Sequence, residues 1–446
     1  MFKKILVANR GEIAVRVIRT CREMGIKTVA IYSEADKESM HRYLADESVC
    51  IGPAQPLKSY LNIPAIIEAA KATACDALHP GFGFLSENAE FARLCDEKGI
   101  KFIGPTGEHI EKMGNKSYAR KIMIENRVPV VPGSDGIVND AKKGLKVARE
   151  IGYPVIIKAS SGGGGKGMRI ANDDDEFDKY FIMCQAEAKS SFNDASVYVE
   201  KYVLSPKHIE FQILADSYGN IVYLGERDCS IQRKHQKMIE EAPSVTLNEN
   251  LRKYMGEAAI SAARAVGYVN AGTIEFLVDK DNNFYFMEMN TRIQVEHPVT
   301  EYVTGIDIVK EQIRVASGQK LSLCQKDIKL QGHSIECRIN AEDVKADFRP
   351  CPGTIISYHA PGGFGVRVDS SAYEGYTIPP FYDSMIAKLI VWGTDRNDAI
   401  NRMKRALGEF IIDGVDTNIE FQLQILNSKD FVEGKFDTSF ISNFNA

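Results

Sequence analysis

The stretch Glu288-Met-Asn290-Thr-Arg292-Ile-Gln294-Val-Glu296-His297-Pro298 has a polar side chain at every even position from 288 to 296. If this stretch is an extended strand, these five side chains share one face, because side chains alternate with a period of two. The odd positions are apolar or threonine, so the pattern also fits the edge of a solvated strand. Two carboxylates, two amides and a guanidinium on one face are more mixed than solubility requires. We therefore interpret the stretch as the centre of a functional site.

A β-hairpin is predicted just upstream, because Gly272–Asp279 and Phe284–Asn290 flank a turn-rich segment at 280–283. A four-residue loop sets Glu275 opposite Glu288, and like charges across a ladder are unfavourable. The pair is tolerated if one carboxyl is protonated or if both hold a cation. With Asn290 nearby, the site offers the oxygen ligands that Mg²⁺ takes when phosphates complete its shell. A register shifted by one or two residues would remove this pair.

Length and composition are those of an ordinary globular protein. The chain has 446 residues, enough for two or three domains, with 44% hydrophobic and 26% charged residues. A net charge of −5 argues against nucleic-acid binding, and no apolar run is long enough to span a membrane. The nine cysteines include no Cys-x-x-Cys pair. This argues against a disulfide framework and indicates a cytoplasmic protein.

Strands and helices alternate from the N-terminus, so residues 1–114 predict an open parallel α/β sheet. The first strand is not followed by Gly-x-Gly-x-x-Gly, which argues against NAD binding. Residues 115–330 predict a central domain with a mobile lid at about 131–203, hinged near Pro132-Gly133. Residues 331–446 predict a third domain of mixed α+β structure.

A glycine-rich stretch, Gly162-Gly-Gly-Gly165-Lys166-Gly167, follows the predicted strand that ends in Lys158. Its backbone N–H groups can approach an anion, because no Cβ obstructs them. Glycine runs are also common in flexible linkers, and this stretch is not a Walker P-loop. The two lysines favour a lid that closes over phosphates.

Three other features, taken alone, are weaker indications of a functional site. Residues 228–241 are basic in the middle and acidic at the end, which also suits a solvated loop. Lone histidines such as His208 and His235 are more often structural than catalytic. Alternation along Ser334–Asn340 places Arg338 on the polar side of its strand, where an arginine usually serves solubility.

Taken together, these residues resemble the ATP-grasp enzymes and, in detail, the biotin carboxylase family. The resemblance covers nearly the whole chain, and its motifs lie at 8–13, 79–88, 226–230, 288–298, 336–343 and 382–385. It implies an ATP-grasp fold and a ligase that joins bicarbonate to biotin, using ATP through a carboxyphosphate intermediate. In acetyl-CoA carboxylase this is the first half-reaction on the way to fatty acid synthesis.

The resemblance also implies roles for individual side chains. The nucleotide would be bound by Lys116, Lys158, Gly163, Gly164, Gly165, Glu200, Lys201, Val203, His208, Gln232, His235, Glu275, Leu277 and Glu288. Two Mg²⁺ or Mn²⁺ ions would be bound by Glu275, Glu288 and Asn290. Bicarbonate and biotin would be positioned by Lys237, Arg292, Gln294, Val295, Glu296, Arg338 and Phe82.

Four of these residues would be catalytic: Lys237, Arg292, Glu296 and Arg338. Glu296 would be the general base on bicarbonate, and Arg338 would stabilise the enolate-like oxygen of biotin. Phe82 departs from the family pattern, because many members have tyrosine there, so a hydroxyl contact to biotin would be lost.

The sequence contains no Ala-Met-Lys-Met type segment that could carry biotin. We therefore expect a separate biotin carboxyl carrier protein and carboxyltransferase subunits as partners, and the family implies a homodimer. This favours a component of acetyl-CoA carboxylase over part of a pyruvate or acyl-CoA carboxylase. Two other classes stay open. One is a nucleotide-binding regulator without turnover, which intact Arg292, Glu296 and Arg338 argue against. The other is an ATP-grasp ligase with an amine or amino acid acceptor.

Overall fold

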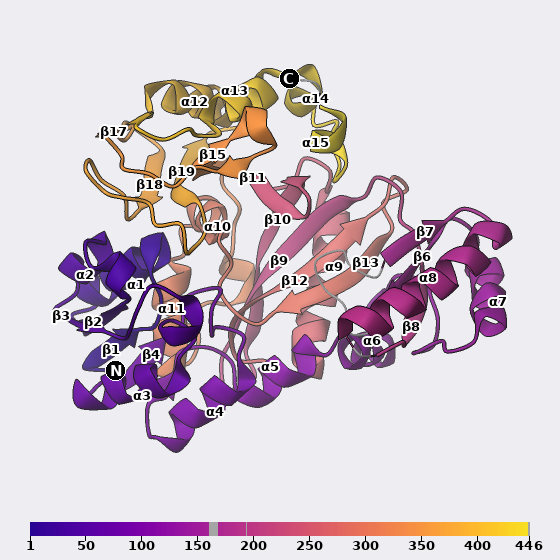
Figure 1. Ribbon diagram of the computed structural model, residues 1–446, viewed down its shortest axis with the longest axis horizontal. Coiled ribbons are helices and arrows are strands. Elements are labelled where there is room, and N and C mark those ends of the chain that lie inside the picture. The colour runs from indigo at the N-terminus through magenta and orange to yellow at the C-terminus, as the bar shows by residue number, and fades with distance from the viewer. Residues whose placement is uncertain (160–167, 193, 445–446) are drawn as a thin grey trace.

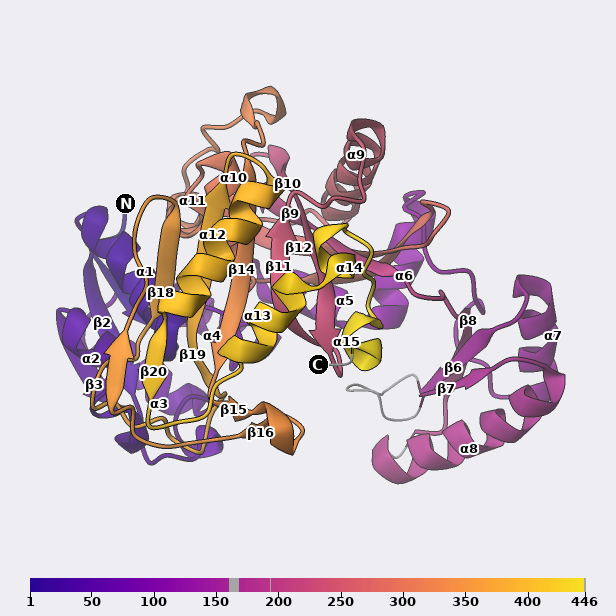
Figure 2. The same cartoon turned by 90° about the horizontal axis from the view of Figure 1, so that it is seen from above.

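The computed structural model describes residues 1–159, 168–192 and 194–444. An N-terminal α/β unit and a C-terminal unit lie against a central sheet, and a smaller unit projects to one side (Figures 1 and 2). Within the described ranges, no helix is both long enough and apolar enough to cross a membrane.

The N-terminal unit contains a five-stranded parallel sheet in the order β3-β2-β1-β4-β5, as predicted. Its strands are β1 (Lys4–Val7), β2 (Lys27–Tyr32), β3 (Glu47–Cys50), β4 (Ala77–His79) and β5 (Lys101–Phe102). The helices are α1 (Gly11–Glu23), α2 (Met40–Leu44), α3 (Ile63–Ala72), α4 (Ala89–Glu97) and α5 (Gly107–Gly114). The middle strand β1 is buried on both faces, because Ile5 and Val7 join one apolar core and Leu6 joins another.

Eight antiparallel strands form the central sheet, in the order β13-β12-β9-β10-β11-β14-β19-β18. They are β9 (Lys207–Ala215), β10 (Ile221–Arg233), β11 (Gln236–Ala242), β12 (Asn270–Val278), β13 (Phe284–Asn290), β14 (His333–Asn340), β18 (Val366–Ser370) and β19 (Met385–Gly393). The helices of this region are α6 (Lys116–Glu125), α9 (Glu249–Ala265), α10 (His297–Thr304) and α11 (Ile308–Ala316). Strands β11 and β14 pair with Ile239 opposite Cys337. One sheet therefore joins the central segment to the C-terminal segment.

Residues 228–241 are not a solvated loop. They form the ends of β10 and β11, and only Lys234 and His235 make the exposed turn between the two strands. Both turn residues have positive φ, 50° and 65°, as a tight reversal of the chain requires. Five polar side chains of this hairpin are nevertheless buried and can contribute to a site inside the protein: Asp228, Ser230, Gln232, Glu240 and Glu241.

The projecting side unit is a three-stranded antiparallel sheet in the order β7-β6-β8 with two helices. Its elements are α7 (Ala141–Ile151), β6 (Val155–Ala159), β7 (Met168–Ala171), α8 (Asp174–Phe192) and β8 (Val197–Lys201). The unit has its own apolar core, whose buried members all lie between Val138 and Val199. The glycine-rich stretch between β6 and β7, with Gly163, Gly164 and Gly165, lies outside the described residues.

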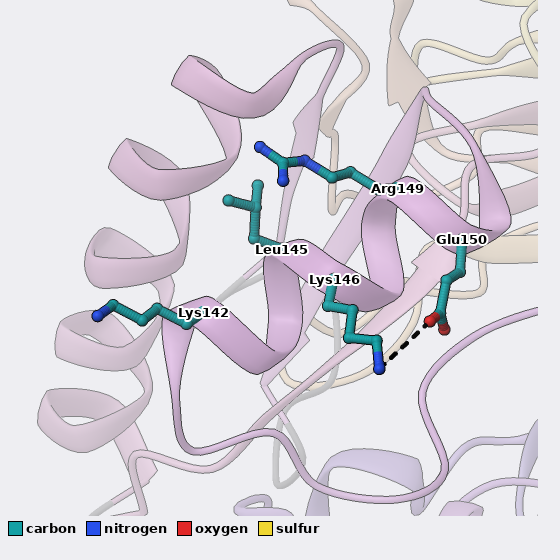
Figure 3. A pocket seen from close by; sticks show the side chains of 5 residues that line it. All are labelled: Lys142, Leu145, Lys146, Arg149 and Glu150. Atoms are coloured by element: carbon teal, nitrogen blue, oxygen red, sulfur yellow. Dashed lines mark ion pairs between the residues drawn. The ribbon is translucent and has the colours of Figure 1, made fainter.

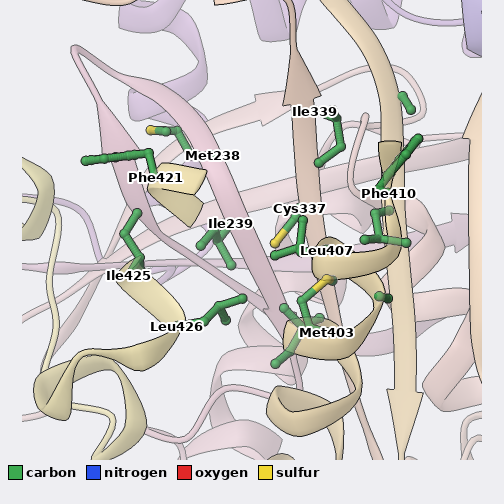
Figure 4. Packing of buried hydrophobic residues seen from close by; sticks show 14 of the residues in the cluster. Met238, Ile239, Cys337, Ile339, Met403, Leu407, Phe410, Phe421, Ile425 and Leu426 are labelled. Carbon is green, nitrogen blue, oxygen red and sulfur yellow. The ribbon is translucent and has the colours of Figure 1, made fainter. Parts of the chain in front are cut away.

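The C-terminal unit packs its helices on the far half of the central sheet. Figure 4 shows Ile239, Cys337 and Ile339 of the sheet together with Met403 and Leu407 of α12 (Arg396–Glu409) in one apolar core. Further elements are β15 (Glu342–Asp343), β16 (Arg349–Pro350), β17 (Ser357–His359), β20 (Ile411–Asp413), α13 (Ile419–Asn427), α14 (Lys429–Val432) and α15 (Phe440–Asn443). Because Cys337 and Ile339 face this core, alternation directs Arg338 to the other face of β14, as predicted.

Candidate active site

The hairpin of β12 and β13 places Glu275 opposite Glu288, as the sequence predicts. Nearer the turn, however, the predicted register is wrong, because Leu277 lies opposite Tyr285 and not opposite residue 286. The register shifts at a bulge, and the extra residue is Met287. Its side chain is 36% exposed, although the alternating pattern placed it on the apolar face. With the observed turn, a regular ladder would place Met287 opposite Glu275. The bulge adds one residue to β13 and so places Glu288 there instead.

Strand β13 ends at Asn290, and residues 291–296 form an irregular segment before α10 begins at His297. The sequence left open whether the whole stretch is extended, and in the structure only its first half is part of a strand. Arg292 nevertheless turns back, and its Nη1 donates to Gln294 Oε1 at 2.8 Å and its Nη2 to Asn290 Oδ1 at 3.0 Å. The polar side chains gather because the chain folds back on itself, and not because they share one strand face.

Lys237 of β11 lies among three buried carboxylates. Its Nζ is 2.7 Å from Glu210 Oε2, 3.1 Å from Glu275 Oε1 and 2.7 Å from Glu296 Oε1. Burial opposes the charge of Lys237, but the surrounding acidic groups outweigh it and hold the pKa of the ammonium well above its usual range. Lys237 is thus a permanent cation at the centre of the site.

Glu275 accepts hydrogen bonds on both carboxylate oxygens. Oε2 accepts from His208 Nε2 at 2.8 Å, and Oε1 accepts from Asn290 Nδ2 and Gln294 Nε2, each at 2.8 Å. Burial favours its neutral form, but Lys237 and His208 lower the pKa of Glu275 below its usual range. The side chain is therefore ionised and fixed in orientation.

Glu288 is the more accessible carboxylate of the pair, with 38% of its side chain exposed and Lys116 Nζ at 3.8 Å. Burial and the charge of Glu275 raise its pKa. Glu275 and Glu288 face each other across the hairpin, and the Asn290 side-chain amide lies beside Glu275, to which its Nδ2 donates. Carboxylate and amide oxygens are the ligands of hard divalent cations, and an ion here would neutralise the paired carboxylates. The residues of the predicted metal site therefore fit Mg²⁺ or Mn²⁺. A second set of potential ligand atoms, from His208, Glu210 and Glu275, also clusters within 4.8 Å.

Glu296 is held between two cations. Its Oε1 accepts from Lys237 at 2.7 Å, and its Oε2 accepts from Arg338 Nη2 at 2.9 Å. Arg338 also contacts Glu240, with Nε donating to Oε1 at 2.7 Å. Burial opposes ionisation of Glu296, but Lys237 and Arg338 keep its pKa well below the usual range. Arg338 is thus part of the site, although the sequence pattern alone favoured a solubility role.

The predicted nucleotide-binding residues lie in two places. Lys158 of the side unit is 2.6 Å from Glu200, whereas Lys201 Nζ donates to the carbonyls of Gly152 and Tyr153 at 2.9 and 2.8 Å. In the central sheet, His208 Nδ1 and Gln232 Nε2 are 3.4 Å apart, and Leu277 lies opposite His208. Val203 follows β8, and His235 lies at the exposed turn of the β10–β11 hairpin.

Two predicted site residues, Phe82 and Val295, lie away from the charged cluster, and one surface pocket lies on α7. Phe82 is half-buried against the apolar core that contains Ile293, and the carbonyl of Val295 accepts from Lys388 at 2.8 Å. The α7 pocket is lined by Lys142, Leu145, Lys146, Arg149 and Glu150 (Figure 3). None of the predicted site residues lines this pocket.

Sequence reasoning missed four charged residues that complete the site. Glu87 Oε2 accepts from Arg292 Nε at 2.8 Å, and Glu240 accepts from Arg338. Arg227 is fully buried and pairs with Glu210. Glu87 and Arg227 lie within motifs that carry the resemblance, but a single glutamate such as Glu210 in an apolar strand gives no signal until the fold places it.

Comparisons with known proteins identify relatives along nearly the whole chain. Three family profiles match: "Biotin carboxylase, N-terminal domain" at residues 1–110, "Carbamoyl-phosphate synthase L chain, ATP binding domain" at 115–324, and "Biotin carboxylase C-terminal domain" at 336–443. Biotin carboxylase 1 of Bacillus subtilis is 56% identical over 446 residues, which are 100% of this chain and 99% of the relative. A pyruvate carboxylase subunit from Methanothermobacter thermautotrophicus is 56% identical over 444 residues, covering 100% and 90% of the two chains.

A solved structure shows the same fold. The biotin carboxylase domain dimer of Hydrogenobacter thermophilus 2-oxoglutarate carboxylase, in complex with MgADP, ADP and bicarbonate, superposes with a TM-score of 0.93 at 53% identity. The match covers 99% of this chain and 97% of that one. The fold and site therefore define an ATP-grasp ligase. Within that class, the chain belongs to the biotin carboxylase family.

Proposed function

We propose that this protein catalyses the ATP-dependent carboxylation of biotin, with bicarbonate as the carbon source. The observation that carries the proposal is the cluster of Lys237, Arg292, Glu296 and Arg338 beside the paired carboxylates of the β12–β13 hairpin. Lys237 and Arg338 on the Glu296 carboxylate, with the guanidinium of Arg292 on the same segment, suit an anionic substrate that must be deprotonated. The paired carboxylates beside them suit the metal-bound phosphates of a nucleotide.

ATP would lie between the central sheet and the side unit. Lys116 approaches Glu288 and Lys158 pairs with Glu200, so both lysines lie where phosphate oxygens could replace a carboxylate partner. The other residues proposed for nucleotide binding are Gly163, Gly164, Gly165, Lys201, Val203, His208, Gln232, His235, Glu275 and Leu277.

Mg²⁺ or Mn²⁺ would be held by Glu275, Glu288 and Asn290, with two ions expected. When bound, such ions neutralise phosphate charge and polarise the transferred phosphoryl group. The protein prepares this position by keeping Glu275 ionised and by leaving Glu288 partly exposed.

Glu296 would be the general base that takes the proton from bicarbonate, so that its oxygen can attack the γ-phosphoryl group. Lys237 and Arg338 hold its pKa low, which makes it a weak base before substrate binds. Bicarbonate bound by Lys237, Arg292, Gln294 and the Val295 backbone would share those cations and make Glu296 more basic. The products of this step would be ADP and carboxyphosphate.

Arg338 would act in the second step, after carboxyphosphate has released CO2 and phosphate. The phosphate would take the proton of the biotin ureido nitrogen, and Arg338 would stabilise the negative oxygen that results. Phe82 would offer its ring, but no hydroxyl, to biotin. Its half-buried position against the core near Ile293 supports a packing role.

The partners of this reaction belong to the proposal as well. Biotin would be supplied by a separate biotin carboxyl carrier protein and the carboxyl group passed to carboxyltransferase subunits, with this chain as a homodimer in the cytoplasm. We propose acetyl-CoA carboxylase as the parent enzyme. Because a pyruvate carboxylase subunit is equally similar, pyruvate carboxylase is the second candidate.

The proposed domains are segments 1–114, 115–330 and 331–446, with the lid at about 131–203.

The test is ATP hydrolysis by the purified protein with Mg²⁺, measured with and without bicarbonate and free biotin. We expect hydrolysis to require bicarbonate and to increase with biotin, and carboxybiotin to accumulate. ATP hydrolysis at the same rate with and without bicarbonate, or stimulated instead by an amine acceptor, would contradict the proposal. Carboxyl transfer to acetyl-CoA or to pyruvate, in the presence of the matching carrier and transferase, separates the two parent enzymes.

The assignment of the base is tested with Glu296→Gln. Loss of a general base should lower kcat by about 10²- to 10⁴-fold. Lys237 keeps two carboxylate partners and Arg338 keeps Glu240, so the fold should survive the change. A folded variant with full activity would show that another residue takes the proton.

A further inference from the structure

Lys388 is a fully buried lysine directly behind the catalytic segment. It lies on β19 with 0% of its side chain exposed, and its Nζ donates to the carbonyl of Val295 at 2.8 Å. Val295 is the residue between Gln294 and Glu296. Lysine is almost never fully buried unless it is paired, so a specific set of partners must compensate its charge.

Those partners come from different parts of the chain. Glu12 Oε1 of α1 is 3.1 Å from Nζ, and Asp369 Oδ2 of β18 is 3.9 Å away. Glu336 of β14 also lies near, and its two buried oxygens lack a hydrogen-bond partner among the residues described. Burial would lower the pKa of Lys388, but the neighbouring carboxylates, Glu12 first among them, raise it overall. Lys388 is therefore charged, and its hydrogen bond to Val295 is a strong one.

The side chains of Arg292, Gln294 and Glu296 are held by their own partners, but the backbone of the segment before α10 has few other anchors among the described residues. Ile293 is buried in the core of the N-terminal unit, and the carbonyl of Gln294 accepts from His297 Nδ1 at 2.8 Å. The next carbonyl, that of Val295, is the one that Lys388 holds. The neighbour of Lys388 across the β14–β19 ladder is Arg338. Lys388 of β19 therefore holds the backbone of this segment, and Arg338 of β14 holds its Glu296 side chain.

We propose that Lys388 is a positioning residue for the bicarbonate site. Its ammonium group fixes the Val295 carbonyl, and this hydrogen bond orients Gln294 and Glu296, which lie on either side of it. The proposal rests on the proposed function in that it takes residues 292–296 as the bicarbonate segment. Lys388 touches no reacting atom, so its effect passes entirely through the backbone.

The test needs a change that removes the hydrogen bond but leaves no net charge behind. Lys388→Met combined with Glu12→Gln removes one cation and its nearest carboxylate together. Glu12→Gln alone is the matched control, because it keeps Lys388 and its bond to Val295. In the double variant we expect the bicarbonate KM to rise about tenfold, as the loss of one strong hydrogen bond would predict, with the ATP KM changed less than about twofold. The control should keep a bicarbonate KM near that of the wild type.

A second measurement does not depend on activity. Hydrogen exchange of backbone amides in residues 291–300 should be faster in the double variant than in the control, while exchange in β9 and β10 stays the same. Equal exchange and equal bicarbonate KM in the two folded variants would overturn the role of Lys388. If the wild type shows no bicarbonate-dependent ATP hydrolysis, the proposed function fails, and the exchange comparison still decides whether Lys388 holds the segment.

Discussion

The central sheet and the side unit differ in how they hold charge. In the central sheet, Lys237 is 13% exposed and contacts three carboxylates that are almost completely buried. In the side unit, Lys158 is 27% exposed, and among the described residues its ion-pair partner is Glu200. On the outer face of the same unit, Lys146 and Glu150 form a loose pair with 79% and 62% of their side chains exposed. The charges of the sheet are therefore fixed by folding, whereas those of the side unit are accessible to a ligand.

The largest effect is expected from Lys237→Met. The change leaves Glu210, Glu275 and Glu296 buried around an apolar side chain, and breaking a buried ion pair costs about 3–5 kcal/mol of unfolding free energy. Urea unfolding measures this loss, and bicarbonate-dependent ATP hydrolysis should disappear. Glu210→Gln added to Lys237→Met should recover part of the stability. An unfolding free energy within about 1 kcal/mol of the wild type would show that these charges are better solvated than their burial indicates.

A pH-dependent effect is expected from Glu336→Gln. Burial raises the pKa of Glu336 well above its usual range, and its oxygens have no hydrogen-bond partner among the described residues. The folded protein therefore keeps a proton that the unfolded chain loses above its ordinary pKa, so this part of the stability falls as pH rises. Glutamine stays neutral at all pH values. Above the ordinary glutamate pKa, the variant should gain about 1.4 kcal/mol in unfolding free energy over the wild type for each pH unit over which Glu336 stays protonated in the fold.

Thermal unfolding of both proteins at several pH values measures this difference. The gap between them should close near the ordinary glutamate pKa, because both side chains are then neutral in the folded and unfolded states. Parallel stability curves across the whole range would mean that Glu336 is ionised in the fold.

A smaller, local effect is expected in the side unit from Gly144→Ala. A Cβ at Gly144 would lie 2.9 Å from Phe177 Cζ and 3.1 Å from Phe181 Cε2, so the core must shift. Overpacking lowers the free energy of unfolding by about 1–3 kcal/mol, and the better helix propensity of alanine raises it by about 1 kcal/mol. Hydrogen exchange should become faster in α7 and α8 but not in the central sheet. Gly408→Ala, in α12 with open space around its Cβ, is the control and should be neutral or stabilising.

The smallest effect on stability is expected from Lys158→Met. A partly exposed ion pair contributes about 0–1 kcal/mol, so the melting temperature should hardly change. The ATP KM should nevertheless rise, because the proposed phosphate contact is lost. A stability loss as large as that of Lys237→Met would remove the contrast between the two regions.

The sequence predicted those parts of the fold in which local patterns and tertiary packing agree. Alternation was sufficient for β14, and the strand–helix order was sufficient for the N-terminal parallel sheet. The Glu275–Glu288 pair was predicted from a regular ladder, although the observed ladder reaches it through a bulge at Met287. A bulge depends on packing around both strands and leaves no distinct pattern in a single sequence.

The site was predicted less completely than the fold. The alternation at 288–296 marked residues that the structure brings together, but β13 ends at Asn290 and the other side chains meet through an irregular segment. Residues 228–241 resemble a solvated loop because their charges are dense, yet the fold buries Asp228, Glu240 and Glu241 against cations from other elements. Glu210 could not be recognised, since its meaning depends on Lys237 and Arg227, which lie on other strands.

The pairing of β11 with β14 has a consequence for dividing the chain. The connection between α11 and β14 includes the exposed residues Lys326 and Asp327, where a cut removes no strand from the sheet. Across such a cut, Ile239 would still lie opposite Cys337, and both belong to one apolar core. Two separately expressed fragments that meet at this position would therefore be complementary halves of one sheet. Only their reassembly would bring Arg338 to Glu296, so recovered activity would report the association of the two fragments.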